Sequence, residues 1–371
     1  MGLDVGDLNA VTLDSIAPRE AFEQAVADGW VNRSVHPDQP YEIWNYSKRA
    51  QFDRHWDQIT RVSRGLITNI ETGEIVARPF PKFFNAGEDD APIPLHEPVV
   101  VTEKVDGSLG IVYTLTNGEL AVATRGSFAS DQAQHATGVL RQRYANFNPP
   151  SEWTFLFEIL YPENRIVVDY GGLDDLVLLG AVDKSTGRSV PLAEAAEYWT
   201  GPVVSVHPFR SFGEVSRDGI SENHEGFVVH FQESDLRLKV KSDWYFKMHR
   251  LFTQTSARTI WENLVEGLDV ESVFEDLPSE FRDWAIGTAR ALRDSHRAIT
   301  ENVDATFAKT LSDLGDDWTR KDFALAVSQN PLRGYLFARL DGKDISPMIW
   351  RAIKPDSEKP FAGEVEADEI A

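Results

Sequence analysis

A lysine that precedes an aspartate-glycine step marks the stretch of this chain best suited to chemistry, Glu103–Gly110. Apolar, β-branched residues at 99–102 and 111–112 flank it. They place Lys104 at the end of a strand and Gly107 in a turn that a ligand can approach closely. A protonated lysine is a poor nucleophile, whereas a neutral lysine is a good one. We therefore predict a nucleophilic lysine beside a ligand site; a surface lysine next to a turn is the alternative.

Two carboxylates and a basic strand face follow farther along the chain. Glu158 lies in the alternating apolar strand expected at 153–161, where a buried charge needs a partner or a metal ion. Glu225 opens a second apolar strand, 225–231. Period-2 alternation in the strand at 236–241 puts three cations on one face: Arg237, Lys239 and Lys241. Such a face needs a shared anion or solvent, so a solvated edge strand is the alternative.

Two more cations precede the lysine motif. Arg64 lies in a hairpin expected over 58–69 and 75–77, and Lys82 lies in a loop of phenylalanines and prolines, 78–88. Such a loop can hold Lys82 rigidly towards an anion. Alternatively, it can be a phenylalanine plug under the surface.

The elements that must position these residues alternate between strands and helices up to about residue 250. We expect a hairpin across Asn117-Gly118, the strongest short turn signal, and a buried strand at 176–183. Ser15 is suited to cap the first of several helices. The helices are expected at 15–28, 131–147, 191–199, 255–265, 279–299, 303–314 and 319–328.

Length and composition predict two folded domains. The chain has 371 residues, of which 42% are hydrophobic, so packed cores are expected. The predicted fold is α+β, with mainly antiparallel sheets in a catalytic domain at 1–250. A smaller all-helical domain follows at 251–353. The acidic tail at 354–371 is expected to be disordered.

The chain is strongly acidic and contains no cysteine. Its formal net charge of -22 argues against non-specific binding to nucleic acid, although it leaves room for a local basic groove. The lack of cysteine excludes disulfides, thiolate zinc sites and cysteine nucleophiles. We expect neither a signal peptide nor a membrane span, because no apolar run approaches the ~18 residues that a span needs. These features predict a cytoplasmic enzyme, in the host cytoplasm if a phage encodes it.

The order of these pieces, more than any one of them, resembles a known superfamily. Lys104-x-Asp106-Gly107, Glu158, Glu225-Gly226 and Lys239-x-Lys241 follow the order of the motifs of covalent nucleotidyltransferases, which include polynucleotide ligases and capping enzymes. Over roughly residues 60–250, further pieces resemble the phage-type RNA ligase 1 family, whose members reseal broken tRNA. These pieces are Arg64-Gly65, Lys82-Phe83-Phe84-Asn85-x-Gly87-Glu88 and Lys239-x-Lys241-x-x-Trp244-Tyr245.

The resemblance implies an ATP-dependent RNA ligase that works in three steps. A lysine attacks the α-phosphate of ATP and releases pyrophosphate, AMP passes to an RNA 5′-phosphate, and a 3′-hydroxyl displaces AMP. The implied cofactors are ATP, as substrate, and Mg²⁺, for which Mn²⁺ can substitute. The implied partner is RNA with 3′-hydroxyl and 5′-phosphate ends, such as a nicked tRNA anticodon loop. A separate end-healing kinase/phosphatase is compatible with this reaction, and we expect a monomer.

The same resemblance assigns roles to the matching positions. Lys104 would be the adenylated nucleophile, Glu158 and Glu225 would serve the metal site, and Glu158 could also contact the ribose. The other expected contacts to ATP or its phosphates are Arg64, Lys82, Glu103, Gly107, Arg125, Lys239, Lys241 and Tyr245, with Phe84, Leu179 and Val228 as an apolar slot for adenine. The family often has a lysine where this chain has Arg125, which keeps the charge but changes the geometry.

Two other classes of function compete. A related nucleotidyltransferase, such as a DNA ligase or a GTP-using capping enzyme, would share much of the motif set. DNA ligases follow the lysine-pair strand with a small β-barrel, whereas this chain turns helical there. A catalytically inactive RNA-end-binding protein is disfavoured because no motif residue is missing. The helical region favours the RNA ligase and points to a module for tRNA or other structured RNA.

Overall fold

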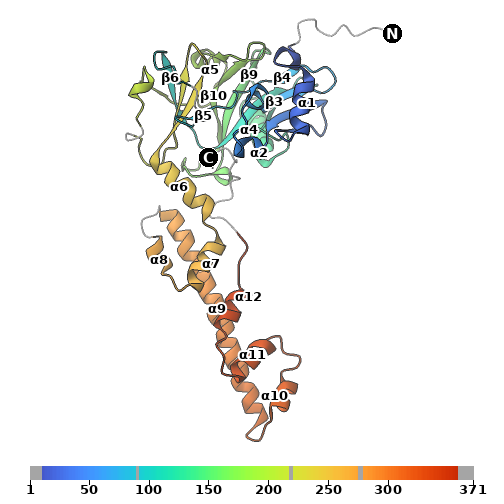
Figure 1. The fold of residues 1–371 in the computed structure, drawn as a ribbon, viewed down its shortest axis with the longest axis vertical. Coiled ribbons are helices and arrows are strands. Elements are labelled where there is room, and N and C mark those ends of the chain that lie inside the picture. Colours follow the sequence, from blue (N-terminus) through green and yellow to red (C-terminus); the bar gives the residue numbers. More distant parts are fainter. Residues whose placement is uncertain (1–10, 89–91, 217–219, 275–278, 358–371) are drawn as a thin grey trace, which may run out of the picture. The chain divides into compact units, whose positions relative to one another are not determined.

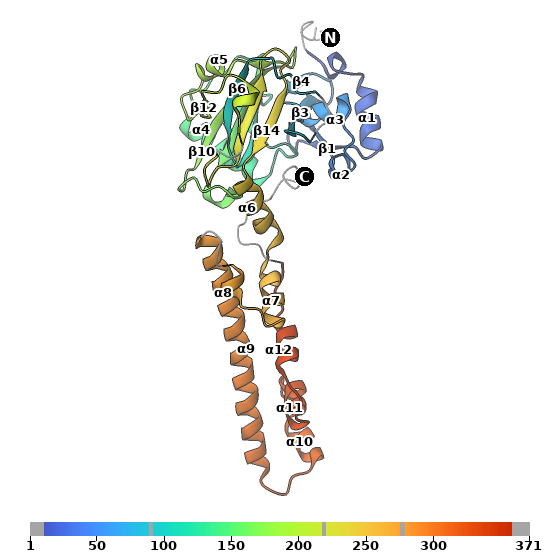
Figure 2. The ribbon, with the colours of Figure 1, turned by 60° about the vertical axis from the view of Figure 1, so that its left-hand side comes forward.

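The computed structural model describes residues 11–88, 92–216, 220–274 and 279–357. These residues form two compact units, divided in sequence between Arg250 and Leu251. The first unit contains three β-sheets with helices around them, and the second is helical (Figures 1 and 2). This confirms the predicted α+β class with a helical C-terminal region. Most of the tail for which we expect disorder, 358–371, lies outside the described residues.

The first sheet is antiparallel, in the order β1-β2-β3-β4. Its strands are β1 (Val31–Val35), β2 (Tyr41–Tyr46), β3 (Arg64–Asn69) and β4 (Ile75–Ala77). The helices of this part are α1 (Arg19–Ala27), α2 (Lys48–Phe52) and α3 (Gln58–Val62). Phe22, Trp44 and Leu66 are fully buried in its core, and the predicted hairpin is confirmed as β3-β4.

Two local predictions in this part are wrong. Ser15 does not cap the first helix, because it lies in a 3₁₀ turn (Leu13–Ser15) and α1 begins only at Arg19. The segment after Asp57 is helical where a strand was expected. Its cause is a capping box, in which the Asp57 carboxylate and the Thr60 side chain satisfy each other's backbone amides.

The other two sheets have five strands each, and their strands contain Lys104, Glu158, Lys239 and Lys241. One is antiparallel, in the order β11-β10-β9-β7-β8, with strands β7 (Ser108–Thr114), β8 (Leu120–Ala123), β9 (Trp153–Leu160), β10 (Asp175–Asp183) and β11 (Ser189–Val190). The other has the order β12-β6-β13-β14-β5, with strands β5 (Phe84–Asn85), β6 (Val99–Lys104), β12 (Val206–His207), β13 (Gly226–Phe231) and β14 (Arg237–Lys241). All its pairs are antiparallel except β14-β5. The hairpin predicted across Asn117-Gly118 is confirmed as β7-β8.

Two helices, which lie within the ranges predicted at 131–147 and 191–199, cover the first of these five-stranded sheets. They are α4 (Asp131–Arg143) and α5 (Leu192–Ala196), and short 3₁₀ turns lie at Pro162–Asn164 and Phe212–Glu214. Alternate residues of β9 face this layer, so Phe155 and Phe157 pack with Ala136 and Trp199. Leu156 and Glu158 alternate with these residues in β9 and therefore lie on the opposite face of the sheet.

The second unit begins within α6 (Asp243–Gln254) and contains α7 (Ala257–Val265), α8 (Val270–Val273), α9 (Ser279–Leu314), α10 (Arg320–Ala326), α11 (Arg333–Leu340) and α12 (Ser346–Ala352). The helices predicted at 279–299 and 303–314 are one helix, α9, because the residues between them include neither glycine nor proline. Val303, Phe323 and Ile349 are fully buried in its core. In the described residues, no helix is both long and apolar enough to cross a membrane.

Candidate active site

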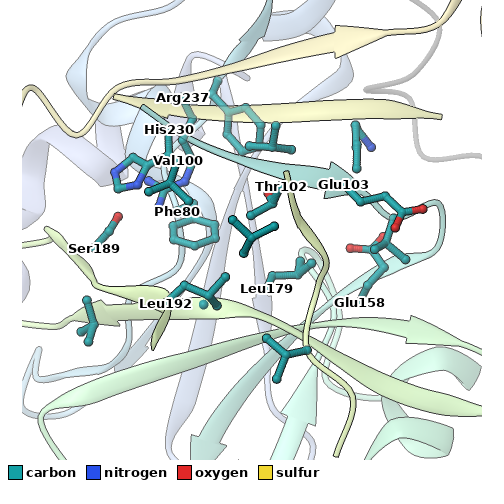
Figure 3. Close-up of a pocket in the computed structure, with 18 of the residues that line it drawn as sticks. Phe80, Val100, Thr102, Glu103, Glu158, Leu179, Ser189, Leu192, His230 and Arg237 are labelled. Atoms are coloured by element: carbon teal, nitrogen blue, oxygen red, sulfur yellow. The ribbon is translucent and has the colours of Figure 1, made fainter. Parts of the chain in front are cut away.

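A cavity of about 570 Å³ lies between the two five-stranded sheets of the first unit. Strands β6, β13 and β14 line one side, and β7, β9, β10 and the segment after β10 line the other. Glu103 and Glu158 lie at one end, and Ser189 and His230 lie at the other (Figure 3). The volume is typical of a site for a small organic molecule.

The register of β6, β13 and β14 sets the inward-facing side chains in three rows. The paired residues are Lys104–Gly226–Lys241, Thr102–Val228–Lys239 and Val100–His230–Arg237. Successive rows are two residues, or roughly 7 Å, apart along the strands. The solvated edge considered for β14 is excluded, because β13 and β5 flank this strand and Lys239 and Lys241 are buried.

Glu225 joins two lysines of the first row. Its Oε2 accepts a hydrogen bond of 2.6 Å from Lys104 Nζ, and its Oε1 lies 3.1 Å from Lys241 Nζ. The side chains of Glu225 and Lys241 are buried, whereas that of Lys104 is 13% exposed and lines the cavity. The Glu225 carboxylate does not line the cavity itself, but its hydrogen bond holds the Lys104 amine at the cavity.

Gly226 makes this arrangement possible. Its φ of +148° is unfavourable for other residues, and a Cβ here would lie 2.1 Å from the carbonyl oxygen of Val240. Only glycine lets β13 run this close to β14 immediately after Glu225.

Asp106 fixes the turn after Lys104, a role that sequence reasoning did not assign. Its buried carboxylate accepts hydrogen bonds from the amides of Val167 (2.9 Å) and Val168 (2.8 Å) and from the Tyr245 hydroxyl (2.7 Å). Its own amide donates to the Tyr170 hydroxyl at 2.7 Å. Tyr245 is itself fully buried and holds this turn without lining the cavity, where a phosphate contact was predicted.

Gly107 brings this turn directly against β9. Its amide donates to Glu158 Oε1 at 3.0 Å, and a Cβ at this position would lie 2.6 Å from the carbonyl oxygen of Ile159. Gly107 and Glu158 both line the cavity. The glycine thus sets the direction of the Glu158 carboxylate, since a larger residue would push the turn away from the strand.

Lys239 is a buried cation in the middle row. Its Nζ lies 5.2 Å from the ring centroid of Phe83. Burial, followed by the charges of Lys104, Lys82 and Lys241, holds the pKa of Lys239 well below its usual range. This part of the cavity is short of negative charge, so an anion bound there would be stabilised.

Lys82 lies in an aromatic cluster next to the cavity. Its Nζ is 5.0 Å from the ring centroid of Trp56, 5.1 Å from that of Tyr46 and 5.6 Å from that of Phe84. Burial and the nearby Arg64 lower the pKa of Lys82 to about 7. A lysine poised in this way gains a full charge when an anion approaches it.

The cavity collects one part of the predicted site, namely Arg64, Glu103, Lys104, Gly107, Glu158, Leu179, Val228 and Lys239. The other predicted residues do not line it; they are Lys82, Phe84, Arg125, Glu225, Lys241 and Tyr245. Phe84 packs against Trp56, while Phe80 and Phe83 face the cavity in its place. Arg125 is buried and donates a hydrogen bond to the Tyr46 hydroxyl.

Sequence reasoning missed most of the far end of the cavity. His230 Nε2 lies 2.6 Å from Asp235 Oδ1, and the Ser189 amide donates to Asp235 Oδ2 at 3.0 Å. The Arg237 guanidinium lies 3.8 Å from the ring centroid of Phe80. Strand alternation already gives Arg237 the same face as the lysine pair, and the same period-2 pattern in β13 could have found His230. Nothing local in the sequence marks Ser189.

A family model described as RNA ligase matches residues 62–250, about half of the chain. The chain belongs to this phage-type RNA ligase family. The matched segment contains β3 and the two sheets that enclose the cavity, and therefore every residue of the predicted site. The resemblance found in the sequence motifs is confirmed.

Two curated relatives match at similar identity. RNA ligase 1 of Bacteriophage TS2126 is 30% identical over 272 residues, which cover 66% of this chain and 62% of the relative. A protein of Thermovibrio ammonificans is 30% identical over 213 residues, or 53% of this chain and 54% of that protein. The chain thus spans between half and two thirds of their length. Among solved structures, an archaeal ATP-dependent RNA ligase is 19% identical, with a TM-score of 0.47 over 75% of this chain and 79% of that one.

Two carboxylates in this RNA ligase cavity could serve a metal ion. Glu103 of β6 and Glu158 of β9 lie at the same end of the cavity (Figure 3). Among the described residues, no group of three or more histidine, aspartate or glutamate side chains could hold a metal ion. Two carboxylates beside the lysines of a cavity fit Mg²⁺, which commonly uses one or two carboxylates, substrate phosphates and water. Glu225 is engaged by Lys104 and Lys241, so it can bind a metal only after those contacts change.

The buried Lys82 predicts a pH-dependent contribution to stability. Its pKa is about 7 in the folded chain against a usual value of 10.5. Below pH 7 the buried amine is charged, and its burial lowers the free energy of unfolding by the largest amount. This free-energy cost falls to zero as the pH rises from 7 towards 10.5. Lys82→Met should therefore raise the free energy of unfolding at pH 6, by on the order of 1 kcal/mol or more, and raise it less at pH 9.

Urea unfolding of both proteins at the two pH values measures this difference. Lys309→Met, at a lysine whose side chain is 76% exposed, is the control and should show no such pH dependence. An equal effect of Lys82→Met at pH 6 and pH 9 would contradict the prediction.

Proposed function

We propose that this chain is an ATP-dependent RNA ligase that joins RNA 3′-hydroxyl and 5′-phosphate ends through a lysyl-AMP on Lys104. The observation that carries the proposal is the Lys104 amine, held by Glu225 at the edge of a cavity that also contains Lys239. Membership of the RNA ligase family supports the choice of reaction.

The rows of the cavity wall suggest how ATP lies. Its α-phosphate belongs near the lysines of the first two rows, because these cations need an anion. The adenine then reaches the apolar surface formed by Val228 and, from the opposite sheet, Leu179. Phe83 lies beside Lys239 and Arg64, so it borders the phosphate region more than the base.

In the first step, Lys104 Nζ forms a bond to the α-phosphorus while the bond to the β-phosphate oxygen breaks and pyrophosphate leaves. The amine must first lose a proton to solvent. Like-charge repulsion from Lys239 favours this loss, whereas the Glu225 carboxylate at 2.6 Å opposes it. Lys239 and Lys241 stabilise the charge that develops on the phosphate. Arg64, at the cavity, and Lys82, next to it, are placed to attract the leaving pyrophosphate or an RNA phosphate.

A divalent ion completes this site, with Mg²⁺ as the physiological metal and Mn²⁺ as a substitute. Glu158 and Glu103 are the carboxylates that would hold it, directly or through water. When bound, the ion neutralises phosphate charge and polarises the phosphoryl group. Glu225 would join the metal site only once Lys104 has been adenylated and its positive charge has been lost.

In the later steps, AMP moves to an RNA 5′-phosphate and a 3′-hydroxyl then displaces it. RNA repair is the role proposed, with a nicked tRNA anticodon loop as one substrate and a separate kinase/phosphatase to prepare the ends. We place the enzyme in the cytoplasm as a monomer. Analytical ultracentrifugation tests the last point, and a concentration-independent dimer would contradict it.

Lys104→Ala should abolish formation of the protein–AMP adduct, because the phosphoramidate bond needs this amine. Mass spectrometry of the purified wild-type protein after incubation with ATP should show one added AMP, which pyrophosphate removes. Joining of RNA that already carries a 5′-adenylate should survive the substitution in part, since that step does not use the amine as nucleophile. An AMP adduct on the alanine variant would refute the assignment. Labelling by GTP in place of ATP would indicate a capping-type enzyme.

Lys239→Ala and Lys241→Ala should each slow adenylation by on the order of 100-fold, as expected when one preorganised charge is lost from the site. Arg237→Ala is the matched control on the same strand face, in the third row. Single-turnover labelling with ATP measures all three rates. If the adenylation rate fell by the same factor in all three variants, the positive charge of the strand in general would speed adenylation, and the lysine pair would have no special role.

We also propose that the helical unit selects structured RNA. A chain ending after Gln254 keeps the cavity and all of α6. It should join a simple single strand at a rate near that of the full chain and join a nicked tRNA anticodon loop more slowly. Both substrates must be compared at one salt concentration, because phosphate contacts make affinity depend on salt. An equal loss on both substrates by a soluble, adenylated protein would show that the helices only support the fold.

A further inference from the structure

A basic and aromatic surface lies outside the cavity, on α2 and the residues that follow it. Residues 46–64 contain five lysines and arginines but only two aspartates, in a chain whose net charge is -22. We name this region the α2 surface and define it by Trp30, Lys48, Arg49, Phe52, Arg54, His55 and Trp56. None of these residues belongs to the predicted site.

Phe52 is the main apolar feature of the α2 surface. Its relative exposure of 89% is the highest among the large hydrophobic side chains that the structure describes. The helix is anchored on its other side, where Ala50 is fully buried and the Ser47 hydroxyl accepts a hydrogen bond from the Ala50 amide. The anchored backbone therefore presents the phenyl ring to solvent in a defined place.

The cations beside Phe52 are available to a ligand. Lys48 and Arg54 are exposed, and neither has an acidic partner within 4.0 Å among the described residues. Arg54 has a φ of +53°, a conformation that is uncommon for a residue with a side chain and is found more often at functional sites. Two cations without an acidic partner therefore lie within four residues of the exposed ring in the sequence.

A second aromatic group extends this surface. The rings of Trp30 and His55 are stacked with centroids 4.1 Å apart, and the Arg49 guanidinium lies 4.0 Å from the Trp30 ring centroid. These contacts fix the positions of flat side chains next to the cations.

The α2 surface continues to the phosphate region of the cavity. Trp56 follows Phe52 by four residues, and its ring centroid lies 5.0 Å from Lys82 Nζ. Lys82 is close enough to Arg64 and Lys241 for their charges to lower its pKa, and Arg64 lines the cavity. The Trp56 end of the α2 surface thus contacts Lys82, which lies next to the cavity.

We propose that the α2 surface binds the single-stranded RNA that leads away from the 5′-phosphate end undergoing ligation. Phe52 stacks on a base, and Lys48 and Arg54 contact backbone phosphates. This inference rests on the proposed function, because the cavity must bind that 5′-phosphate. Alternating cations and exposed rings are the usual means of binding a single strand without reading its sequence. An apolar protein partner would leave the two cations without counter-charges.

Binding of a 5′-phosphorylated single-stranded RNA, followed by fluorescence anisotropy, tests the proposal on the full chain. Phe52→Ala should weaken binding roughly tenfold, as for the loss of one base–aromatic stack. Lys48→Gln and Arg54→Gln should each weaken binding and reduce the slope of log affinity against log salt by about one. A donor of one nucleotide has no further base to stack on Phe52, so its binding should not change in the Phe52→Ala protein.

Arg141→Gln, at a half-exposed arginine of α4, is the matched control and should bind like the wild type. If Phe52→Ala and Arg54→Gln both bound the long RNA within twofold of wild type, the proposal would be overturned. A wild-type dimer that Phe52→Ala dissociates would also overturn it, because the surface would then bind a second copy. Failure of the ligase assignment would be seen separately, as absence of the AMP adduct on the wild-type protein, which needs no RNA.

Discussion

The paired contact of Glu225 with Lys104 and Lys241 is the interaction on which the rest of the site depends. Three lysines and Arg64 come together around this part of the cavity, and burying charges of one sign is unfavourable unless they are neutralised. Glu225, Glu103 and Glu158 supply three carboxylates against these four cations. The fold therefore carries a local shortage of negative charge, which a phosphate group can relieve. In the proposed function, binding of a phosphate would relieve the unfavourable burial of the Lys239 and Lys82 amines.

The sheet register is what makes that crowding possible. Antiparallel pairing of β13 with both β6 and β14 fixes which residues are opposite each other, and a shift by one residue would turn all of them to the other face. Gly226 and Gly107 then allow the close approaches that a side chain would block. Asp106 secures the turn between β6 and β7 from the side away from the cavity. The position of the proposed nucleophile, Lys104, thus depends on the backbone as much as on charged side chains.

Much of this site could be predicted from the sequence, because strand alternation and motif order are local patterns. They placed Lys104 at a strand end and gave Lys239 and Lys241 a common face. The helical start of the segment after Asp57 could not be seen in its apolar pattern, since a capping box outweighed it. Phe84 was misplaced for a related reason: three phenylalanines follow one another closely, and only the pairing of β5 with β14 decides which face the cavity. Asp106, Tyr170 and Tyr245 come from distant parts of the chain, and their contacts depend on tertiary structure.

The acidity of the chain bears directly on how it can bind RNA. A net charge of -22 repels a polyanion at long range, yet at physiological ionic strength this repulsion is screened beyond about 8 Å. Within that distance local charges dominate, and the cations near the cavity are largely buried rather than spread over the surface. Such a protein gains little from non-specific attraction along an RNA strand. This agrees with the proposed recognition of an end, where a terminal phosphate can enter the buried positive region and neighbouring bases can stack outside it. Acidity at the surface and cations in the interior together favour RNA ends over the continuous strand.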